Sequence, residues 1–454
     1  MRDKILGSDI VHTALTLAWP VMLSNVFETA YNLTDAFWLG KVGPEALAAP
    51  SISWPIMFLL ISLSAGFGIA GLSLVSQYTG AGESEKANKV AGQLLSILLI
   101  SSLTVAVIGF FFTENILRLL NIPEGVLDVT AGYLKITFLG LPFMFVHFGF
   151  QALLRGYGDT RTPMILSVSS ATLDTILDPF FVFGWLSLPA MGAAGAALTT
   201  VMTRGIAGVI GVYLLFSGKV GIKLKLEHLK PDFNLIKRIF SIGIPSSIGQ
   251  SGTALGFVLL TSLVSLEDGV LGGRGLLLSA YGIGNRLSSV INIIIFGGVS
   301  ALSTMVGQNL GADQKERAGE VVKKLFLIFI AISVIESLIV YLLRIPLYKV
   351  FINVQEVIDI GSTYITFFAP SIPFFAVFRL CMSVFEGAGH TRVSMALSLI
   401  RLWGMRILLS YIFYFIFGMG AIGIWAGLAI GNFGAAIFSI VLLSRSEWRK
   451  KIIE

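Results

Sequence analysis

Apolar stretches of about twenty residues recur along the whole chain, and this feature limits its fold more than any other. A helix needs roughly 20 residues to cross a hydrocarbon core of about 30 Å. Of the 454 residues, 55% are hydrophobic and only 13% are charged, whereas a soluble domain carries roughly 25% charged residues. The lipid bilayer is therefore the expected solvent and the first partner of this chain.

The spans are expected to be helices rather than barrel strands. Barrel strands alternate apolar and polar residues, but stretches such as 94–112 and 325–343 are apolar on all sides. We predict an all-α polytopic membrane protein with twelve transmembrane helices. The expected spans are 11–38, 46–76, 90–113, 127–153, 163–186, 192–216, 235–264, 277–308, 319–343, 357–385, 393–417 and 421–444.

Lysine and arginine gather in the loops on one side of these spans, together with both ends of the chain. This is the positive-inside pattern, and it predicts cytoplasmic termini in the cell (inner or plasma) membrane. The longest polar connection, 217–234, falls on that side at the midpoint of the chain. We interpret it as a cytoplasmic linker between an N-terminal six-helix bundle, 1–216, and a C-terminal one, 235–454.

The two halves repeat each other in sequence. The segment RGYGDTR at 155–161 returns as EGAGHTR at 386–392, and Gln77 and Gly80 return as Gln308 and Gly311 at the same displacement. Matches at one long period indicate a structural repeat. Because both halves begin and end on the same side, we expect two parallel repeats around a central cavity, an arrangement typical of alternating-access transporters.

Several classes of function are disfavoured by composition. The net charge of +6 comes from short loops that set topology, so we expect no nucleic-acid partner. The single cysteine, Cys381, excludes a CxxC metal or redox motif. No GxxxxGK[ST] segment is present, so ATP is not expected to drive the protein directly. We expect a monomer that is not an enzyme and uses no metal and no cofactor.

The first span carries one polar stripe. Asn25, Glu28, Tyr31, Asn32 and Asp35 fall at spacings of three and four residues, which places them on one side of the helix. A polar stripe on a transmembrane helix is expected to face protein or water. Glu28 could alternatively lie at the membrane interface, and Tyr31 and Asn32 could simply bond a neighbouring helix.

The fifth span carries a second stripe, in which Asp174 and Asp178 lie one turn apart. Two carboxylates this close do not both ionise cheaply. A central Asp costs about 2.5–3.5 kcal/mol on insertion scales, which favours a functional role. Asp174 could instead be a helix-packing donor when protonated.

A proline interrupts the first span of each half, at Pro20 and Pro245. Proline removes a backbone hydrogen bond, so Pro20 should form either a static kink or a moving hinge. The C-terminal half has no acid at the positions of Asp35 and Asp178. Its spans contain four arginines, for which we favour a structural role over ligand binding: Arg286, Arg379, Arg401 and Arg406.

Four segments in their order and spacing resemble the multidrug and toxic compound extrusion (MATE) family over essentially the whole chain. These segments are LAWPVM at 17–22, DAFWLG at 35–40, GPEALA at 43–48 and LRGYGDTRTP at 154–163. The resemblance implies a secondary active multidrug efflux transporter that exports amphipathic cationic or aromatic compounds. It implies antiport with a cation, H⁺ or alternatively Na⁺.

The chain is more similar to the DinF-like branch of that family. This resemblance implies ion coupling at Asp35, Asp174 and Asp178, a cavity position for Tyr133, and movement of the first helix around Pro20. The branch commonly has Asn at the position of Asp174, which leaves the number of titrating carboxylates open. The NorM-like branch of the family has a carboxylate in the seventh span, whereas the stretch 245–257 of this chain offers no acid. This departure from the NorM-like pattern disfavours sodium coupling through the C-terminal half.

Two other functions compete with this interpretation. A lipid-linked oligosaccharide flippase of the same superfamily should present cations to pyrophosphate, whereas the embedded charge that we identify in the N-terminal half is anionic. An intramembrane aspartyl protease is suggested by Gly156-Tyr-Gly-Asp159, but Asp159 lies in a basic loop. We interpret that motif as a glycine-rich turn between two helices.

Overall fold

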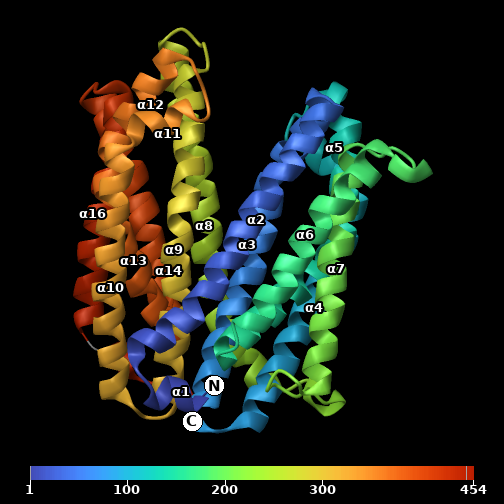
Figure 1. The fold of residues 1–454 in the computed structure, drawn as a ribbon, viewed down its shortest axis with the longest axis vertical. Coiled ribbons are helices and arrows are strands. Elements are labelled where there is room, and N and C mark those ends of the chain that lie inside the picture. Colours follow the sequence, from blue (N-terminus) through green and yellow to red (C-terminus); the bar gives the residue numbers. More distant parts are fainter. Residues whose placement is uncertain (1, 446, 454) are drawn as a thin grey trace. The chain divides into compact units, whose positions relative to one another are not determined.

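The computed structural model describes residues 2–445 and 447–453, and its regular elements within these ranges are all helices (Figure 1). The first half contains α1 (Arg2–Gly7), α2 (Ile10–Val42), α3 (Pro44–Ala81), α4 (Ser84–Leu119), α5 (Glu124–Tyr157), α6 (Arg161–Phe183), η1 (Trp185–Ser187) and α7 (Ala193–Ser217). The linker contains η2 (Leu226–Leu229). The second half contains α8 (Phe233–Val270), α9 (Leu276–Gly311), α10 (Lys315–Leu342), α11 (Arg344–Lys349), α12 (Gln355–Phe368), η3 (Ala369–Ser371), α13 (Ile372–Ala388), α14 (Thr391–Leu399), η4 (Ile400–Ile407), α15 (Leu408–Tyr411), η5 (Ile412–Ile416), α16 (Gly420–Ser444) and η6 (Glu447–Arg449).

Among the described residues, twelve helices are long and apolar enough to cross a membrane, which confirms the twelve predicted spans. The tenth span is continuous from α12 through η3 to α13, and the eleventh runs from α14 to η5. Several spans are longer than predicted. The 38 residues of α3, for example, extend over about 57 Å at 1.5 Å per residue, so this helix reaches beyond a hydrocarbon core or tilts within it.

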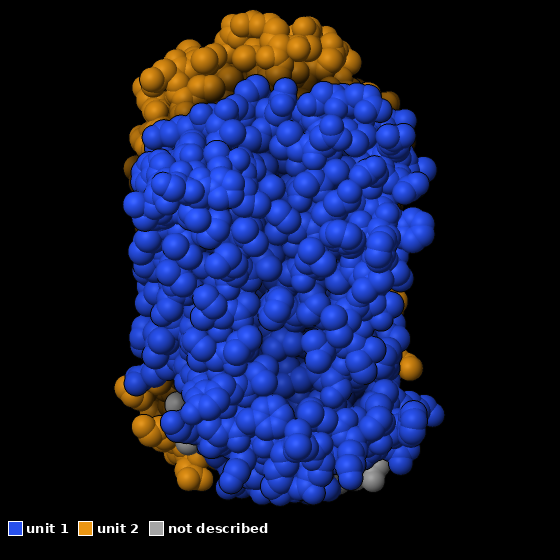
Figure 2. Space-filling model, turned by 90° about the vertical axis from the view of Figure 1, so that its right-hand side faces the viewer, with its two compact units in different colours: residues 1–2, 19–247 blue, residues 3–18, 248–454 orange. Residues whose placement is uncertain are grey.

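The chain forms two compact units, which Figure 2 distinguishes by colour. One unit contains Trp19–Ser247, and the other contains Asp3–Ala18 and the chain from Ile248 onward. The divisions fall inside α2 and α8 rather than at residues 216 and 235, where the sequence pattern places the repeat boundary. Both divisions lie within three residues of a proline inside the helix, Pro20 or Pro245.

In each unit, a glycine at the equivalent position of the repeat lets two helices pack closely. A Cβ atom on Gly156 of α5 would lie 2.7 Å from the carbonyl oxygen of Leu72 on α3. A Cβ atom on Gly387 of α13 would overlap the carbonyl oxygen of Ser303 on α9. Glycine therefore lets the two backbones approach, as small residues commonly do at transmembrane helix interfaces. The repeat seen in sequence is thus also a repeat of packing.

The Gly156-Tyr-Gly-Asp159 motif closes the turn between α5 and α6. Gly158 adopts the left-handed conformation with φ of 99°, which ends α5. The Asp159 carboxylate accepts hydrogen bonds at 3.0 Å from the backbone N–H groups of Arg161 and Thr162, where α6 begins. Asp159 therefore satisfies two backbone N–H groups at the start of α6, as expected for a glycine-rich turn rather than for a protease site.

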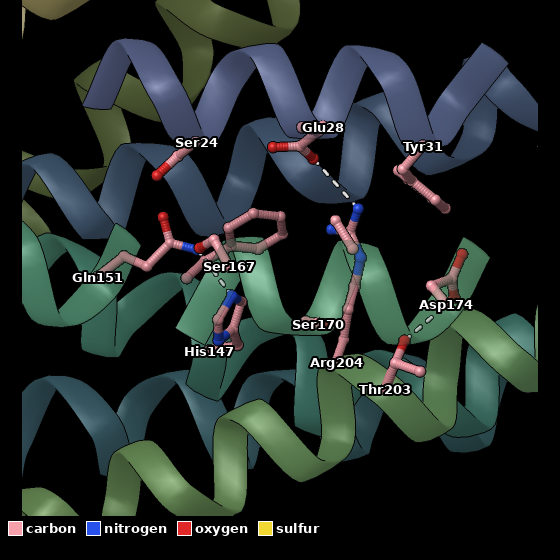
Figure 3. Close-up of a pocket in the computed structure, with 12 residues that line it drawn as sticks. Ser24, Glu28, Tyr31, His147, Gln151, Ser167, Ser170, Asp174, Thr203 and Arg204 are labelled. Carbon is pink, nitrogen blue, oxygen red and sulfur yellow. Dashed lines mark hydrogen bonds and ion pairs between the residues drawn. The ribbon is translucent and has the colours of Figure 1, made fainter. Parts of the chain in front are cut away.

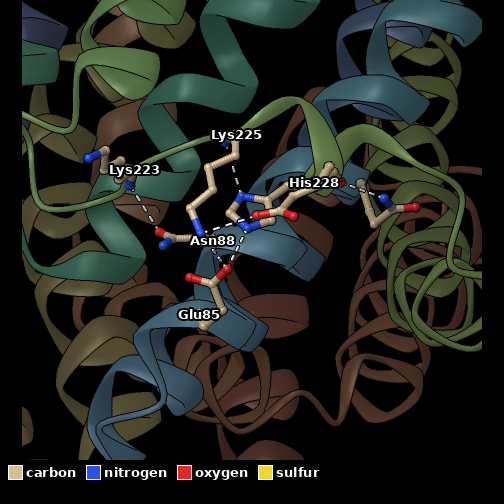
Figure 4. Close-up of polar contacts among 7 residues, drawn as sticks. Glu85, Asn88, Lys223, Lys225 and His228 are labelled. Carbon is tan, nitrogen blue, oxygen red and sulfur yellow. Dashed lines mark hydrogen bonds and ion pairs between the residues drawn. The ribbon is translucent and has the colours of Figure 1, made fainter.

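The linker 217–234 is bound to the start of α4 (Figure 4). The side-chain amide of Gln93 donates to the carbonyl oxygens of His228 and Lys230, both at 2.7 Å, and its oxygen accepts from the N–H of Asp232 at 3.1 Å. A Cβ atom on Gly92 would lie 2.5 Å from the carbonyl oxygen of His228. The linker thus has a defined path on the N-terminal unit, because α4 satisfies its backbone polar groups.

We expect Gly387→Ala to destabilise the protein by roughly 1–3 kcal/mol, because the new methyl group meets backbone and the helices α9 and α13 must separate. The thermal unfolding of the purified protein in detergent measures this effect. Gly282→Ala on α9 is the matched control, since a Cβ atom there meets nothing within 4 Å. Equal unfolding temperatures for the two variants would contradict the packing constraint.

Candidate substrate and ion-coupling site

The polar stripe of α2 divides into exposed and partly buried positions. Glu28 and Asn32 are exposed, whereas Tyr31 and Asp35 are partly buried. The Tyr31 hydroxyl lies 3.3 Å from the hydroxyl of Thr200 on α7. One carboxylate oxygen of Asp35, Oδ1, is buried and has no hydrogen-bond partner among the described residues. The stripe therefore faces protein along part of its length.

The two acids of α6 are among the most buried polar side chains of the N-terminal unit. Asp174 is 2% exposed and Asp178 is 0% exposed. The Thr203 hydroxyl on α7 donates to Oδ1 of Asp174 at 3.0 Å. Neither oxygen of Asp178 has a hydrogen-bond partner in the described part of the chain. An ionised carboxylate without such partners is costly in apolar surroundings.

A pocket of about 390 Å³, including its open mouth, lies between α2, α5, α6 and α7 (Figure 3). Of the sequence-predicted residues, Glu28, Tyr31 and Asp174 line it, and Asp35, Asp178 and Asn32 do not. The residues that line it are Ser24, Glu28, Tyr31, His147, Phe148, Gln151, Ser167, Ser170, Ala171, Asp174, Thr203 and Arg204. The pocket therefore combines carboxylates, hydroxyl groups and aromatic rings within one unit.

Tyr133 does not line this pocket. It packs from α5 against an apolar cluster that includes Leu39, Ala49 and Val182. Pro20 is a buried residue inside the continuous helix α2, and its carbonyl oxygen accepts a 2.9 Å hydrogen bond from the Ser24 hydroxyl. Ser24 belongs to the pocket, so the proline lies one turn from it.

Arg204 is the main residue that sequence reasoning missed. Its guanidinium extends from α7 into the pocket, where it pairs with the Glu28 carboxylate at 3.1 Å. It also lies 5.4 Å from the ring centre of Tyr31 and 5.9 Å from that of Phe148. The expectation that the embedded charge of the N-terminal half is purely anionic is therefore wrong. An arginine inside the apolar span 192–216 was the available signal.

His147 and Gln151 form a second polar pair in the pocket. The side-chain nitrogen of Gln151 lies 2.8 Å from Nε2 of His147. The two side chains therefore form a hydrogen bond across one turn of α5. Nδ1 is buried without a partner among the described residues. This i,i+4 pair on α5 was also missed, since neither residue is unusual in sequence.

A possible metal-ligand group lies outside the membrane, where Glu85, Glu227 and His228 place one ligand atom each within 4.8 Å of one another. The Lys225 ammonium already lies 3.3 Å from Glu85 and 3.1 Å from Glu227. Hydrogen bonds from Lys225 to Glu227 and Glu85 raise the pKa of this amine above its usual range. An ammonium thus takes the place of a cation, and we assign no metal to these residues (Figure 4).

The model of the MatE family matches residues 20–180 and again residues 252–412. The chain belongs to the MatE family. The double match confirms the two repeats, and the family consists of membrane transporters. This multi-pass MatE protein therefore has one repeat of the family fold in each half of its sequence.

Curated relatives of this MatE protein match from 70% to nearly all of its length. The probable multidrug resistance protein YoeA of Bacillus subtilis is 26% identical over 96% of this chain and 93% of its own length. The probable multidrug resistance protein NorM of Thermotoga maritima is 23% identical over 97% and 93%. An FAD transporter of Shewanella oneidensis is 28% identical over 70% of each chain.

Solved structures share the fold of this MatE protein. A crystal structure of MATE in complex with MaL6 has a TM-score of 0.91 at 23% identity and covers 98% of both chains. A MOP superfamily transporter from Pyrococcus furiosus has the same TM-score and identity, with 99% of this chain covered. The confirmed family resemblance does not specify a branch, so the DinF-like assignment stays a prediction.

We expect Arg204→Met to increase the affinity of the protein for a planar organic cation such as ethidium by about tenfold. The variant keeps the length of the side chain but removes a positive charge beside Glu28 and Tyr31, and a unit charge at this range is worth more than 1 kcal/mol in a partly buried site. Fluorescence titration of the purified protein measures the Kd. Arg118→Met, an exposed arginine on α4, is the control, and equal affinities for both variants would count against the pocket.

Proposed function

We propose that this protein exports amphipathic cationic or aromatic compounds from the cell across the plasma membrane by proton antiport and alternating access. The observation that carries the proposal is the group of buried acids in the N-terminal unit, in which Asp178 is fully buried and neither of its oxygens has a described hydrogen-bond partner. The relatives YoeA and NorM, both named as probable multidrug resistance proteins, support efflux as the direction.

Three carboxyl groups form the proposed coupling site. Asp174 and Asp178 lie one turn apart on α6, and both Asp35 and Asp174 act electrostatically on Asp178. Three negative charges would repel one another in surroundings of low polarity, so the group favours at least one bound proton. A proton binds to a single carboxylate oxygen, whereas Na⁺ needs several oxygen ligands, and neither oxygen of Asp178 has a described hydrogen-bond partner. This property supports H⁺ rather than Na⁺ as the coupling ion.

The pocket would bind the exported compound, which is exchanged for the proton. Glu28 and Asp174 offer negative charge, while Tyr31 and Phe148 offer aromatic faces to a delocalised cation. Asn32 lies at the exposed edge of the same helical stripe, and Tyr133 would extend the aromatic surface if α2 moved. Protonation of the acids from outside would weaken retention of a cationic drug. Proton release toward the cytoplasm would restore the charged site for the next molecule.

Pro20 is the proposed hinge of this cycle. The two compact units divide within α2 between Ala18 and Trp19, directly before this proline. Without the N–H of Pro20, the preceding turn lacks one hydrogen bond and resists bending less. The hinge would let α2 change its packing when the acids gain or lose protons.

A flippase for pyrophosphate-linked sugars is less well supported. Such a protein should present cations to its substrate. The pocket does contain Arg204, but Glu28 pairs with it at 3.1 Å and Asp174 lies in the same pocket. The carboxylates therefore outnumber the guanidinium group, which favours cationic cargo.

We expect Asp35→Asn and Asp178→Asn to fold normally and to lose drug efflux driven by a pH gradient. Asparagine has the shape of the protonated acid but binds no proton, so export should fall to the rate measured without a gradient. Ethidium transport in proteoliposomes under an imposed pH gradient, and separately under a Na⁺ gradient, measures the coupling. Asp128→Asn, an exposed acid on α5, should behave as the wild type.

Retention of full pH-driven export by both Asp35→Asn and Asp178→Asn would refute the proton mechanism. If the wild type exports ethidium under a Na⁺ gradient instead, and the two variants lose that export, the coupling ion is Na⁺. Efflux itself would then still stand.

We expect Pro20→Ala to leave the unfolding temperature within a few degrees of the wild type and to slow ethidium export several-fold. Alanine restores the missing hydrogen bond of α2 and so stiffens the hinge. The matched control is Pro55→Ala, a proline inside α3 that is exposed. Wild-type export by Pro20→Ala in the same proteoliposome assay would make Pro20 a static kink.

A further inference from the structure

Three arginines of the C-terminal unit are not used by the proposed antiport. Arg379 lies on α13, and Arg401 and Arg406 lie on η4. Arg401 is 5% exposed, and the other two are partly buried. The fourth arginine singled out in the sequence, Arg286 on α9, is exposed and does not belong with them.

The helical geometry of η4 determines which arginines come together. Residues 400–407 form a π-helix, in which each N–H bonds to the carbonyl five residues earlier. In an α-helix, Arg401 and Arg406 would point about 140° apart, because five residues turn through 500°. The wider π turn brings positions five apart close to one face. Such π segments are rare and occur frequently at functional sites.

The guanidinium groups have few hydrogen-bond partners. Each carries five N–H donors. Among the described residues, the one hydrogen bond that these three groups make runs from Nη1 of Arg401 to Oδ1 of Asn432, at 3.2 Å. Asn432 is oriented for this role, because its side-chain nitrogen donates to the Ser371 hydroxyl at 3.1 Å. The Nε atoms of Arg379, Arg401 and Arg406 are all buried without a partner among the described residues.

Aromatic rings compensate for only part of this charge. The Arg401 guanidinium lies 4.7 Å from the ring centre of Phe378 and 5.2 Å from that of Phe375. Arg379 lies 5.2 Å from the ring centre of Phe296. Such contacts are worth roughly 0.5–2 kcal/mol each. Burial of an unpaired charge costs more than that, so the rings alone do not account for the buried Arg401 and the partly buried Arg379 and Arg406.

Arg401 is repelled by the two other arginines. Both Arg406 and Arg379 act electrostatically on Arg401. The buried carboxylate of Glu386 attracts Arg379, which offsets one positive charge of the three. A guanidinium kept for structure alone would be expected to use its donors on carbonyl or carboxylate oxygens. Here the positive charge of the arginines is only partly offset, and their buried Nε donors have no described acceptor.

We propose that Arg379, Arg401 and Arg406 form a binding site for a phosphate group within the C-terminal unit. Guanidinium forks match the oxygens of a phosphate and bind them with charge-assisted hydrogen bonds. A phosphate would accept from the unpartnered Nε donors and would offset the charge that remains beside Glu386. The group belongs either to the headgroup of an anionic lipid or to a soluble phosphate compound. This site does not depend on proton antiport by the N-terminal unit.

Thermal unfolding of the purified, delipidated full chain in a neutral detergent tests the site with two phosphate probes. The first is inorganic phosphate, compared with chloride at equal ionic strength. The second is dioctanoyl phosphatidylglycerol, compared with dioctanoyl phosphatidylcholine. The variants are Arg379→Gln, Arg401→Gln and Arg406→Gln, with Arg286→Gln as the matched control on an exposed arginine of the same unit.

We expect one probe to raise the unfolding temperature of the wild type and of Arg286→Gln. The three other variants should need at least about tenfold more probe for the same shift, because each loses a charge-assisted contact. Stabilisation by phosphatidylglycerol alone assigns the site to a lipid headgroup, and stabilisation by inorganic phosphate assigns it to a soluble compound.

Two results would overturn the site. The first is that neither probe stabilises the wild type beyond its comparison compound. The second is that the three variants respond to the probes as the wild type does, even if they unfold at lower temperature, since a purely structural arginine affects stability but not the response. If Arg401→Gln does not fold, Arg379→Gln and Arg406→Gln decide the question by the same comparison.

Discussion

Every backbone N–H and C=O group that lies in hydrocarbon must find its hydrogen-bond partner within the protein, and this requirement governs the rest of the structure. A helix meets the requirement within one segment. The chain therefore consists of long helices, and its irregular segments are short. Where backbone outside the spans needs partners, side chains supply them, as Gln93 does for the linker and Asp159 does for the start of α6. Glycine then decides how closely such helices pack, and the contacts of Gly156 and Gly387 repeat this solution in both units.

Because water is absent, a polar side chain inside a span also costs free energy unless it finds a hydrogen-bond partner within the protein. In the N-terminal unit, Asp178 has no described partner, while Asp174 has one hydroxyl donor and Glu28 has a guanidinium. The spans of the C-terminal unit contain Arg379, Arg401 and Arg406 as well as the buried acid Glu386. The two repeats thus share their packing but differ in the charged side chains that they carry. A duplicated fold can keep its helix contacts while each half acquires a different chemistry, since few residues of a helix interface carry charge.

The existence, order and approximate limits of the spans were determined by the sequence alone, because hydrophobic length is a local property of the chain. The repeat was also determined there, since equivalent glycines and turns recur in register. Asp35, Asp174 and Asp178 were recognisable because an acid inside an apolar stretch is rare. Even so, the sequence pattern places the domain boundary in the linker, whereas the compact units divide beside Pro20 and Pro245, inside two helices. That division depends on which turns of a helix find neighbours, and no single segment records it.

Only the tertiary structure decided which polar residues share a site. Arg204 joins Glu28 because α7 packs beside α2, and a separation of 176 positions gives no local sign of that contact. Tyr133 matched a cavity position by resemblance, yet it packs against apolar side chains in this structure. The arginines Arg401 and Arg406 come together through a π-helix, whose wider turn the sequence does not mark. These contacts depend on burial and on which helices become neighbours, and both become known only when helices that are distant in sequence are packed together.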